Sequence, residues 1–265
     1  MMDYIKAIET RHSVRTYTEQ PLTENQISVL REAIADASTP FGGKVKILLA
    51  RTADATLLKP STYGVIRGAS DYLLMYLADD RLSRLSGGYA LEQVVLAATS
   101  MGLGTCWVGG TFSAGSFNHA SEVPAGLRLS IVCPVGTAAP NQGLLHRITS
   151  AIARSHTRKP MERLFFQGSI GTPLQTDSPF YEALEMMRLA PSSVNSQPWR
   201  AIVSTDNSGV VFYSTSIKLL NEIDMGIGLC HFALAMQEHK KRGHFSMTPL
   251  EGESPEGLYF VARYQ

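Results

Sequence analysis

The stretch Ala190-Pro191-Ser192-Ser193-Val194-Asn195-Ser196-Gln197-Pro198-Trp199-Arg200 is the most informative part of this chain. It follows a run of helical character (residues 181–189) and precedes a strand-like run (residues 201–204). Loops in this position often carry the binding groups of proteins that mix helices and strands. Asn195 and Gln197 each offer a donor and an acceptor, which suits the polar edge of a planar heterocycle. The loop is therefore a candidate ligand site, and the rest of the chain decides what it binds.

Length and composition place the chain among ordinary globular proteins. Its 265 residues are enough for one large domain or two small ones, and 44% of them are hydrophobic. A formal net charge of +1 gives no overall attraction to nucleic acid or to an anionic membrane. Cys106, Cys133 and Cys230 are widely spaced, which favours reduced, buried thiols over a disulfide or a metal site. No signal peptide or membrane-spanning run is visible, so we expect a cytoplasmic protein without membrane contact.

Periodic patterns predict alternating helices and strands. Thr23 and Gln26 form a capping-box pattern ahead of a helix over residues 27–37. Gly87-Gly88 precedes a run that is apolar nearly all round, which predicts a buried helix over residues 89–101. Residues 142–171 are irregular and basic, and we interpret them as a crossover between two halves. Further helices are expected over residues 4–10, over 179–189 and from 224–228 through 238, and strands over 45–50, 72–77, 129–133, 201–204, 210–213 and 259–264.

The two halves of the chain follow the same pattern. Each has a helix, a loop and a strand, and later a glycine-led apolar helix that begins Gly88-Tyr89-Ala90-Leu91 or Gly226-Ile227-Gly228-Leu229. We interpret this as a diverged internal duplication, with residues 1–165 as the first half and residues 166–265 as a shorter second half. Two such halves packed face to face mimic a two-fold dimer within one chain. We therefore predict an α+β fold of two tandem half-domains that form an intrachain pseudo-dimer and one compact unit.

The halves differ in the residues that could hold a ligand. Residues 38–44 stand where the second half has residues 191–197, but they lack the carboxamides. Only the first half begins with Arg11-His12-Ser13-Val14-Arg15, whose two guanidinium groups and hydroxyl suit a phosphate. Taken alone, these arginines are more often solvated surface charges. A site that needs both segments forms once per chain.

A glycine-rich turn follows the first buried helix, at residues 102–110. Its backbone can approach a flat ligand closely, although it lacks the strand–turn–helix setting of a dinucleotide fingerprint. Trp107 within it is also well explained as a core residue. Arg158 and Lys159 either add positive charge to a phosphate site or belong to a solvated loop. No pattern typical of a serine hydrolase, a P-loop or a metal centre is found, and no side chain stands out as a general acid.

Together, residues 11–15, residues 190–199 and the turn at residues 102–110 resemble the FMN-dependent nitroreductase family, in its form with two half-domains fused in one chain. The resemblance covers most of the chain and implies a nitroreductase-like fold with FMN between the halves. The implied cofactor-binding residues are Arg11, His12, Ser13, Arg15, Arg158 and Lys159 toward the phosphate, Trp107, Val108, Gly109 and Gly110 near flavin N5, and Pro191, Ser192, Ser193, Asn195 and Gln197 at the ring. His12 stands where a second arginine is common in the family.

The resemblance also implies an activity. NAD(P)H would give hydride to flavin N5, and the reduced flavin would then reduce a nitroaromatic, a quinone or a similar small acceptor. The cofactor would carry the chemistry, with no catalytic side chain and no metal. Two alternatives stay open: an FMN-binding carrier or sensor without turnover, and a flavin-consuming enzyme of the same fold. The expected partners are NAD(P)H and the acceptor, without nucleic acid or membrane, and the expected state is a monomeric pseudo-dimer or a homodimer.

Overall fold

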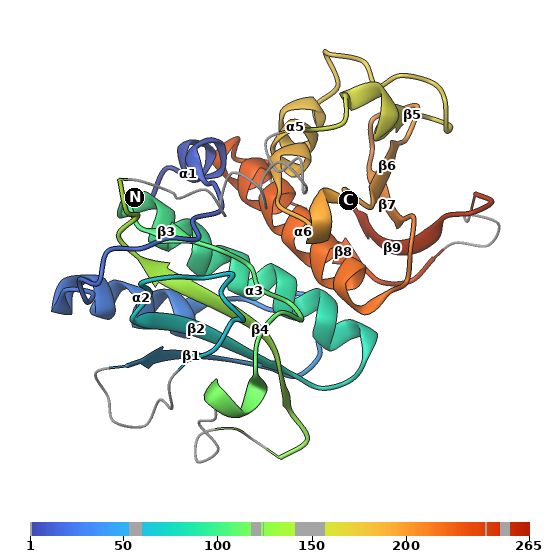
Figure 1. Cartoon of the computed structure of the whole chain (residues 1–265). Coiled ribbons are helices and arrows are strands. Elements are labelled where there is room, and N and C mark those ends of the chain that lie inside the picture. Colours follow the sequence, from blue (N-terminus) through green and yellow to red (C-terminus); the bar gives the residue numbers. More distant parts are fainter. Residues whose placement is uncertain are drawn as a thin grey trace.

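The computed structural model describes residues 2–52, 60–117, 123, 125–140, 157–241, 243–249 and 255–265. Two β-sheets enclose a central pair of long helices, α3 (Arg81–Ser100) and α6 (Leu219–Glu238) (Figure 1). The first sheet has the order β1-β2-β4-β3 and the second the order β5-β6-β7-β9-β8. Their strands are β1 (Val45–Arg51), β2 (Asp71–Leu77), β3 (Gly104–Thr105), β4 (Arg128–Gly136), β5 (Phe165–Gln167), β6 (Trp199–Val203), β7 (Val210–Ser214), β8 (Phe245–Ser246) and β9 (Tyr259–Tyr264).

The remaining helices lie around this centre. They are α1 (Tyr4–Thr10), α2 (Glu24–Asp36) and α5 (Tyr181–Leu189), with 3-10 turns η1 (Ala114–Phe117), η3 (Met161–Arg163) and η4 (Ser193–Asn195). Thr23 caps α2 and forms the predicted capping box with Gln26. Of the basic crossover expected over residues 142–171, residues 142–156 lie outside the described part of the chain. The crossover was expected to be irregular throughout, but β5 lies within it, because parallel pairing with β6 orders this short segment.

The two halves repeat one topology, which confirms the predicted α+β fold of tandem half-domains. The series β1-β2-α3-β4 is repeated as β6-β7-α6-β9, and in each series the middle strand pairs antiparallel with both neighbours. Helix α2 precedes β1 as α5 precedes β6, and the short strands β3 and β8 pair with β4 and β9. The boundary expected between residues 165 and 166 falls inside β5, a strand of the second sheet.

Glycines bring α3 and α6 into close contact. A Cβ atom added to Gly88 would collide with the carbonyl oxygen of Ile223, and one added to Gly226 would collide with that of Leu85. The backbones can approach this closely only because both positions lack a side chain. The sequence expectation that each helix begins near its glycines was wrong, since α3 starts at Arg81 and α6 at Leu219. In this interface, close packing outweighs the intrinsic helix penalty of glycine.

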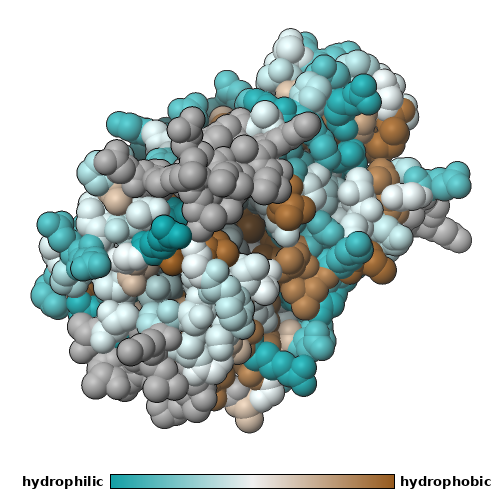
Figure 2. Space-filling view, in the orientation of Figure 1, coloured by the Kyte–Doolittle hydropathy of each residue, from teal (hydrophilic) through white to brown (hydrophobic). Residues whose placement is uncertain are grey.

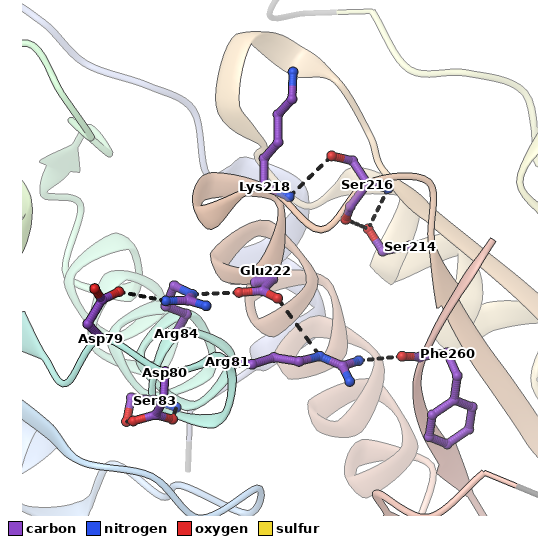
Figure 3. Close-up of polar contacts among 10 residues, drawn as sticks. All are labelled: Asp79, Asp80, Arg81, Ser83, Arg84, Ser214, Ser216, Lys218, Glu222 and Phe260. Atoms are coloured by element: carbon purple, nitrogen blue, oxygen red, sulfur yellow. Dashed lines mark hydrogen bonds and ion pairs between the residues drawn. The ribbon is translucent and has the colours of Figure 1, made fainter. Parts of the chain in front are cut away.

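A charged pair lies across the same interface. Nε of Arg84 donates to Oε2 of Glu222 at 2.5 Å, and the two residues are 138 positions apart. The same separation relates Gly88 to Gly226, so Arg84 and Glu222 are pseudo-symmetric positions. In a true homodimer, identical residues near a two-fold axis face each other. The fused chain can instead place opposite charges there, as Figure 3 shows with Asp79 and Arg81 beside them.

One continuous hydrophobic core joins the halves. It includes side chains of α3, α6 and the inner faces of both sheets. Of the helices in the described residues, α6 is long and apolar enough to cross a membrane, but 78% of its most apolar window is buried inside the protein. This burial explains its composition as that of a core helix. Cys106, Cys133 and Cys230 are all buried and unbridged.

Candidate functional site

A cavity of about 540 Å³ lies where the two halves meet. We call it the central cavity. Its volume is within the range of small-molecule and cofactor pockets, about 300–1,000 Å³. It is lined by Arg11, Ser13, Arg15, Val65, Cys106, Trp107, Val108, Gly109, Thr111, Ile131, Arg158, Pro191, Ser192, Ser193, Val194, Asn195, Leu220, Ile223, Asp224 and Ile227. The three segments singled out in the sequence therefore meet around one space.

Extended backbone explains which residues of the 11–15 segment reach the cavity. Ser13 forms a bridge with Thr105 of β3, and the N–H of Val14 donates to the Thr105 carbonyl at 2.8 Å. Side chains alternate in an extended segment, so the odd-numbered residues line the cavity and Val14 packs against Gly104 in the core. His12 follows the even positions and does not line the central cavity. It borders a smaller cavity of about 230 Å³ that shares Arg11, Ser13 and Arg158.

Positive charge collects at one end of the central cavity. Nε of Arg11 and Nη1 of Arg15 are buried and have no hydrogen-bond partner among the described residues. Arg158 donates to the Leu189 carbonyl at the end of α5, at 2.9 Å from Nη2. Burial, and next the like charges of Arg11 and Arg188, lower the pKa of Arg158 to about 10. Unsatisfied guanidinium donors beside another cation favour an anionic ligand, since buried polar groups are normally paired.

The loop at residues 191–197 forms a second wall, which adjoins Arg158, and it has an unusual backbone conformation. Val194, Asn195 and Gln197 all have positive φ values, of 46°, 55° and 48°. Non-glycine residues rarely adopt this region, and such strain persists only where surrounding contacts impose it. The Ser193 N–H donates to Oδ1 of Asp224 at 2.9 Å, and the Gln197 N–H donates to Oγ of Ser192 at 2.9 Å. The loop is thus held against α6 and against itself.

Gln197 and Lys159 brace the loop from behind and do not line the central cavity. Gln197 is 3% exposed, and its Oε1 accepts from the Lys159 N–H at 2.7 Å. Its Nε2 donates to Oδ1 of Asn195 at 3.1 Å. Nζ of Lys159 donates to the Ser196 carbonyl at 2.7 Å. The side-chain groups expected to meet a ring edge and a phosphate therefore bond to the protein itself.

The glycine-rich turn forms the third wall. Gly109 is wedged between Ile131 and Leu220, whose side chains would lie 2.8 and 2.9 Å from an added Cβ. Trp107 and Val108 line the central cavity beside it, whereas Gly110 lines only a neighbouring cavity. A side chain at Gly109 would force these walls apart, so the bare backbone faces the ligand space.

A fully buried polar network supports Trp107 from behind. Its Nε1–H donates to Oε2 of Glu92 at 2.9 Å. The other oxygen, Oε1, lies 2.8 Å from Nε2 of His231, and Nδ1 of His231 lies 3.1 Å from the Met186 carbonyl. A carbonyl only accepts, so Nδ1 carries a proton and one further proton is shared between Nε2 and the carboxyl. Glu92 lies on α3 and His231 on α6, so both halves fix this wall.

The contribution of α6 to the cavity was not predicted from the sequence. Leu220, Ile223 and Ile227 recur at helical spacing and give the cavity an apolar floor, and Asp224 lies among them. Burial raises the pKa of Asp224 to about 7, against hydrogen bonds from Ser193, Asn221 and Ser196 that lower it. Two carboxylates, Glu222 and Asp224, at the start of a long apolar helical run were the signal that could have identified it.

Among the described residues, the cavities found include none of comparable size at the pseudo-symmetric position of the first half. Tyr89 stands 138 positions before Ile227 and packs edge-on against Phe41, with ring centroids 5.5 Å apart. Phe245 of β8 contacts both rings. Ser86, the counterpart of Asp224, donates to the carbonyl of Gly42. Aromatic side chains thus fill the counterpart of the central cavity. This agrees with the expectation of one site per chain.

Comparisons with known proteins agree with this architecture. The family model described as "Putative TM nitroreductase" matches residues 3–236. A "putative nitroreductase" of Thermotoga maritima MSB8 is similar over 99% of this chain and 93% of its own, with 19% identity and a TM-score of 0.61. A nitroreductase from Desulfitobacterium hafniense DCB-2, solved with bound FMN, covers 53% of this chain and 92% of its own, with 18% identity and a TM-score of 0.43. No curated protein matches the sequence.

Proposed function

The chain belongs to the putative TM nitroreductase family, and from this premise we propose that it is an FMN-dependent oxidoreductase. It would take hydride from NAD(P)H and reduce a nitroaromatic, a quinone or a similar small acceptor in a ping-pong cycle. One FMN would bind per chain, in the central cavity.

The observation that carries the proposal is the pair of unsatisfied guanidinium atoms at one end of that cavity. Nε of Arg11 and Nη1 of Arg15 lie buried without partners in the described part of the chain. A phosphate monoester would satisfy both, with charge-assisted hydrogen bonds. The other walls suit the rest of FMN: an apolar floor from α6, the bare backbone at Gly109, and the polar loop of Ser192 and Ser193. The donor set therefore fits an anionic, flat, largely apolar cofactor.

Bound FMN supplies the hydride and electron chemistry, and the protein supplies orientation. The arginines hold the phosphate end, and Asp224 keeps the Ser193 loop in its strained conformation. The Glu92–His231 pair fixes the indole of Trp107, so the wall of the cavity is rigid. Preorganised walls of this kind reduce the entropy that binding would otherwise cost.

The decisive experiment is the visible absorption spectrum of the purified protein after reconstitution with FMN. We expect bound, oxidised flavin that NADH or NADPH bleaches. Arg15→Ala should weaken FMN binding about 10- to 100-fold, because a charge-assisted contact contributes about 1.5–3 kcal/mol. Arg31→Ala, on the exposed face of α2, is the matched control and should bind FMN normally. Protein that cannot be loaded with FMN would overturn the proposal.

Two alternatives use the same cavity and give different results. A carrier or sensor would bind FMN but show no steady-state oxidation of NADH or NADPH. A flavin-consuming enzyme would lose the flavin absorbance irreversibly during aerobic turnover. The arrangement favours the oxidoreductase, because apolar space remains beside the glycine-rich turn for a second substrate.

A further inference from the structure

A second cavity, of about 550 Å³, adjoins the central cavity. We call it the lateral cavity. Gly109 and Leu220 line both, so the two cavities adjoin at these residues. Figure 2 shows apolar side chains around a hollow in the middle of the face where the two halves meet. The lateral cavity has apolar walls from Leu77, Phe112, Leu129 and Leu219, and its charged lining residues are Asp79, Arg84 and Arg128.

The lateral cavity has a pseudo-symmetric counterpart that is closed. Arg81 stands 138 positions before Leu219 and lines a space of only about 10 Å³, together with Glu222. Its guanidinium group donates to the carbonyl of Phe260, and its Nε lies 3.9 Å from Oε1 of Glu222 (Figure 3). A long, anchored side chain thus fills the counterpart. Leu219 is shorter and leaves the lateral cavity open beside the glycine-rich turn.

The charges of the lateral cavity favour an anion. Arg84 is paired with two acids, since Nη1 lies 2.9 Å from Asp79, the acid in the lining, and Nε lies 2.5 Å from Glu222. Arg128, at the start of β4, is exposed and has no ion-pair partner among the described residues. Among the charged residues that line the lateral cavity, Arg128 is therefore the one whose charge is not compensated, and it lies beside the apolar walls. A ligand that matches both features has a flat apolar body and one anionic group.

We propose that the lateral cavity binds an aromatic carboxylate. The ring lies between Leu219 and Phe112, and the carboxylate meets the guanidinium group of Arg128. Its use as the acceptor site rests on the proposed function, because the adjoining central cavity is then the one that holds FMN. Binding itself does not depend on that function.

Calorimetric titration with 4-nitrobenzoate, and with the neutral 4-nitrobenzyl alcohol for comparison, tests the proposal. The protein is titrated both FMN-saturated and FMN-free, so that failure of flavin loading and failure of ligand binding are separate results. The wild type should bind 4-nitrobenzoate more tightly than the alcohol. Arg128→Gln should weaken binding of the carboxylate about fivefold and leave the alcohol unchanged, as expected for one exposed ion pair. Arg31→Gln, at another exposed arginine, should change neither.

A second variant tests the position of the ring. Leu219→Trp adds bulk at a residue that is 45% exposed, so folding should tolerate it, and both probes should lose binding while FMN affinity stays normal. Binding that is insensitive to both Arg128→Gln and Leu219→Trp would overturn the proposal. Loss of 4-nitrobenzoate binding in Arg15→Ala instead would place the probe in the central cavity and would also overturn it.

Discussion

Replacing Asp224 by asparagine should remove a loss of stability that the wild type suffers as the pH rises. The Asp224 carboxyl is buried beside the central cavity, and burial raises its pKa from 3.8 to about 7. A carboxyl with a higher pKa in the folded state binds its proton more tightly there than in the unfolded chain. Folding is therefore favoured at low pH, and stability falls as the pH rises from about 4 to about 7. Above about 7 the group is ionised in both states, and the loss is complete.

The magnitude follows from the size of the shift. Each pKa unit corresponds to about 1.4 kcal/mol, so the whole window amounts to about 4 kcal/mol and the part between pH 5 and pH 8 to about 3 kcal/mol. Asparagine keeps an oxygen for the Ser193 N–H and does not titrate. Relative to the wild type, Asp224→Asn should therefore gain about 3 kcal/mol of stability between pH 5 and pH 8.

Urea denaturation of the wild type and of Asp224→Asn at several pH values measures this difference. The contributions of the other titrating groups cancel in it, because both proteins contain them. Asp206→Asn is the control, because it is the same substitution at a carboxyl whose pKa is lowered instead of raised. Hydrogen bonds from Ser204 and Ser208 lower the pKa of Asp206 to about 2, so its stabilisation is lost only as the pH falls below about 4. Its difference from the wild type should be constant from pH 5 to pH 8. A constant difference for Asp224→Asn as well, or one that favours the wild type at high pH, would refute the reasoning.

Three further predictions concern the interface between the halves. His231→Leu removes the histidine partner of the fully buried Glu92 carboxyl and leaves it only the Trp107 N–H, so it should cost about 3–5 kcal/mol of unfolding free energy in urea; a loss below 1 kcal/mol would contradict this. Gly226→Ala should lower the free energy of unfolding by at least about 2 kcal/mol, because the added Cβ collides with the backbone of α3. An unchanged melting temperature would show instead that the two helices can move apart. Arg84→Glu should be destabilising by itself because it places two acids together, and adding Glu222→Arg should restore most of the loss; absence of coupling in this double-mutant cycle would argue against the ion pair.

Local patterns predicted many of the elements of this protein. The capping box at Thr23, the hairpin of β6 and β7, and strand β9 lie close to where the sequence places them, because caps, turns and alternation are local properties. The starts of α3 and α6 were missed. Glycine normally weakens a helix, and only the contact with the partner helix explains why it lies inside these two.

The candidate site divides in the same way. Eleven of the fifteen residues predicted to bind the cofactor line the central cavity, and His12, Gly110, Lys159 and Gln197 do not. Sequence spacing cannot say that the 11–15 segment pairs with β3, an arrangement that turns His12 away from its neighbours. Nor can it say that the amide of Gln197 is already paired within the loop.

The sequence by itself determined that this is a duplicated α+β chain with unequal halves, since the repeated pattern and the missing carboxamides are written in residue order. Only the tertiary structure decided where the unequal residues meet. The Ser192 loop and the 11–15 segment share one cavity because α3 and α6 cross at their glycines. The opposite space is filled by Phe41, Tyr89 and Phe245. Packing between distant segments, and the burial of charge that comes with it, is a property of the folded chain alone.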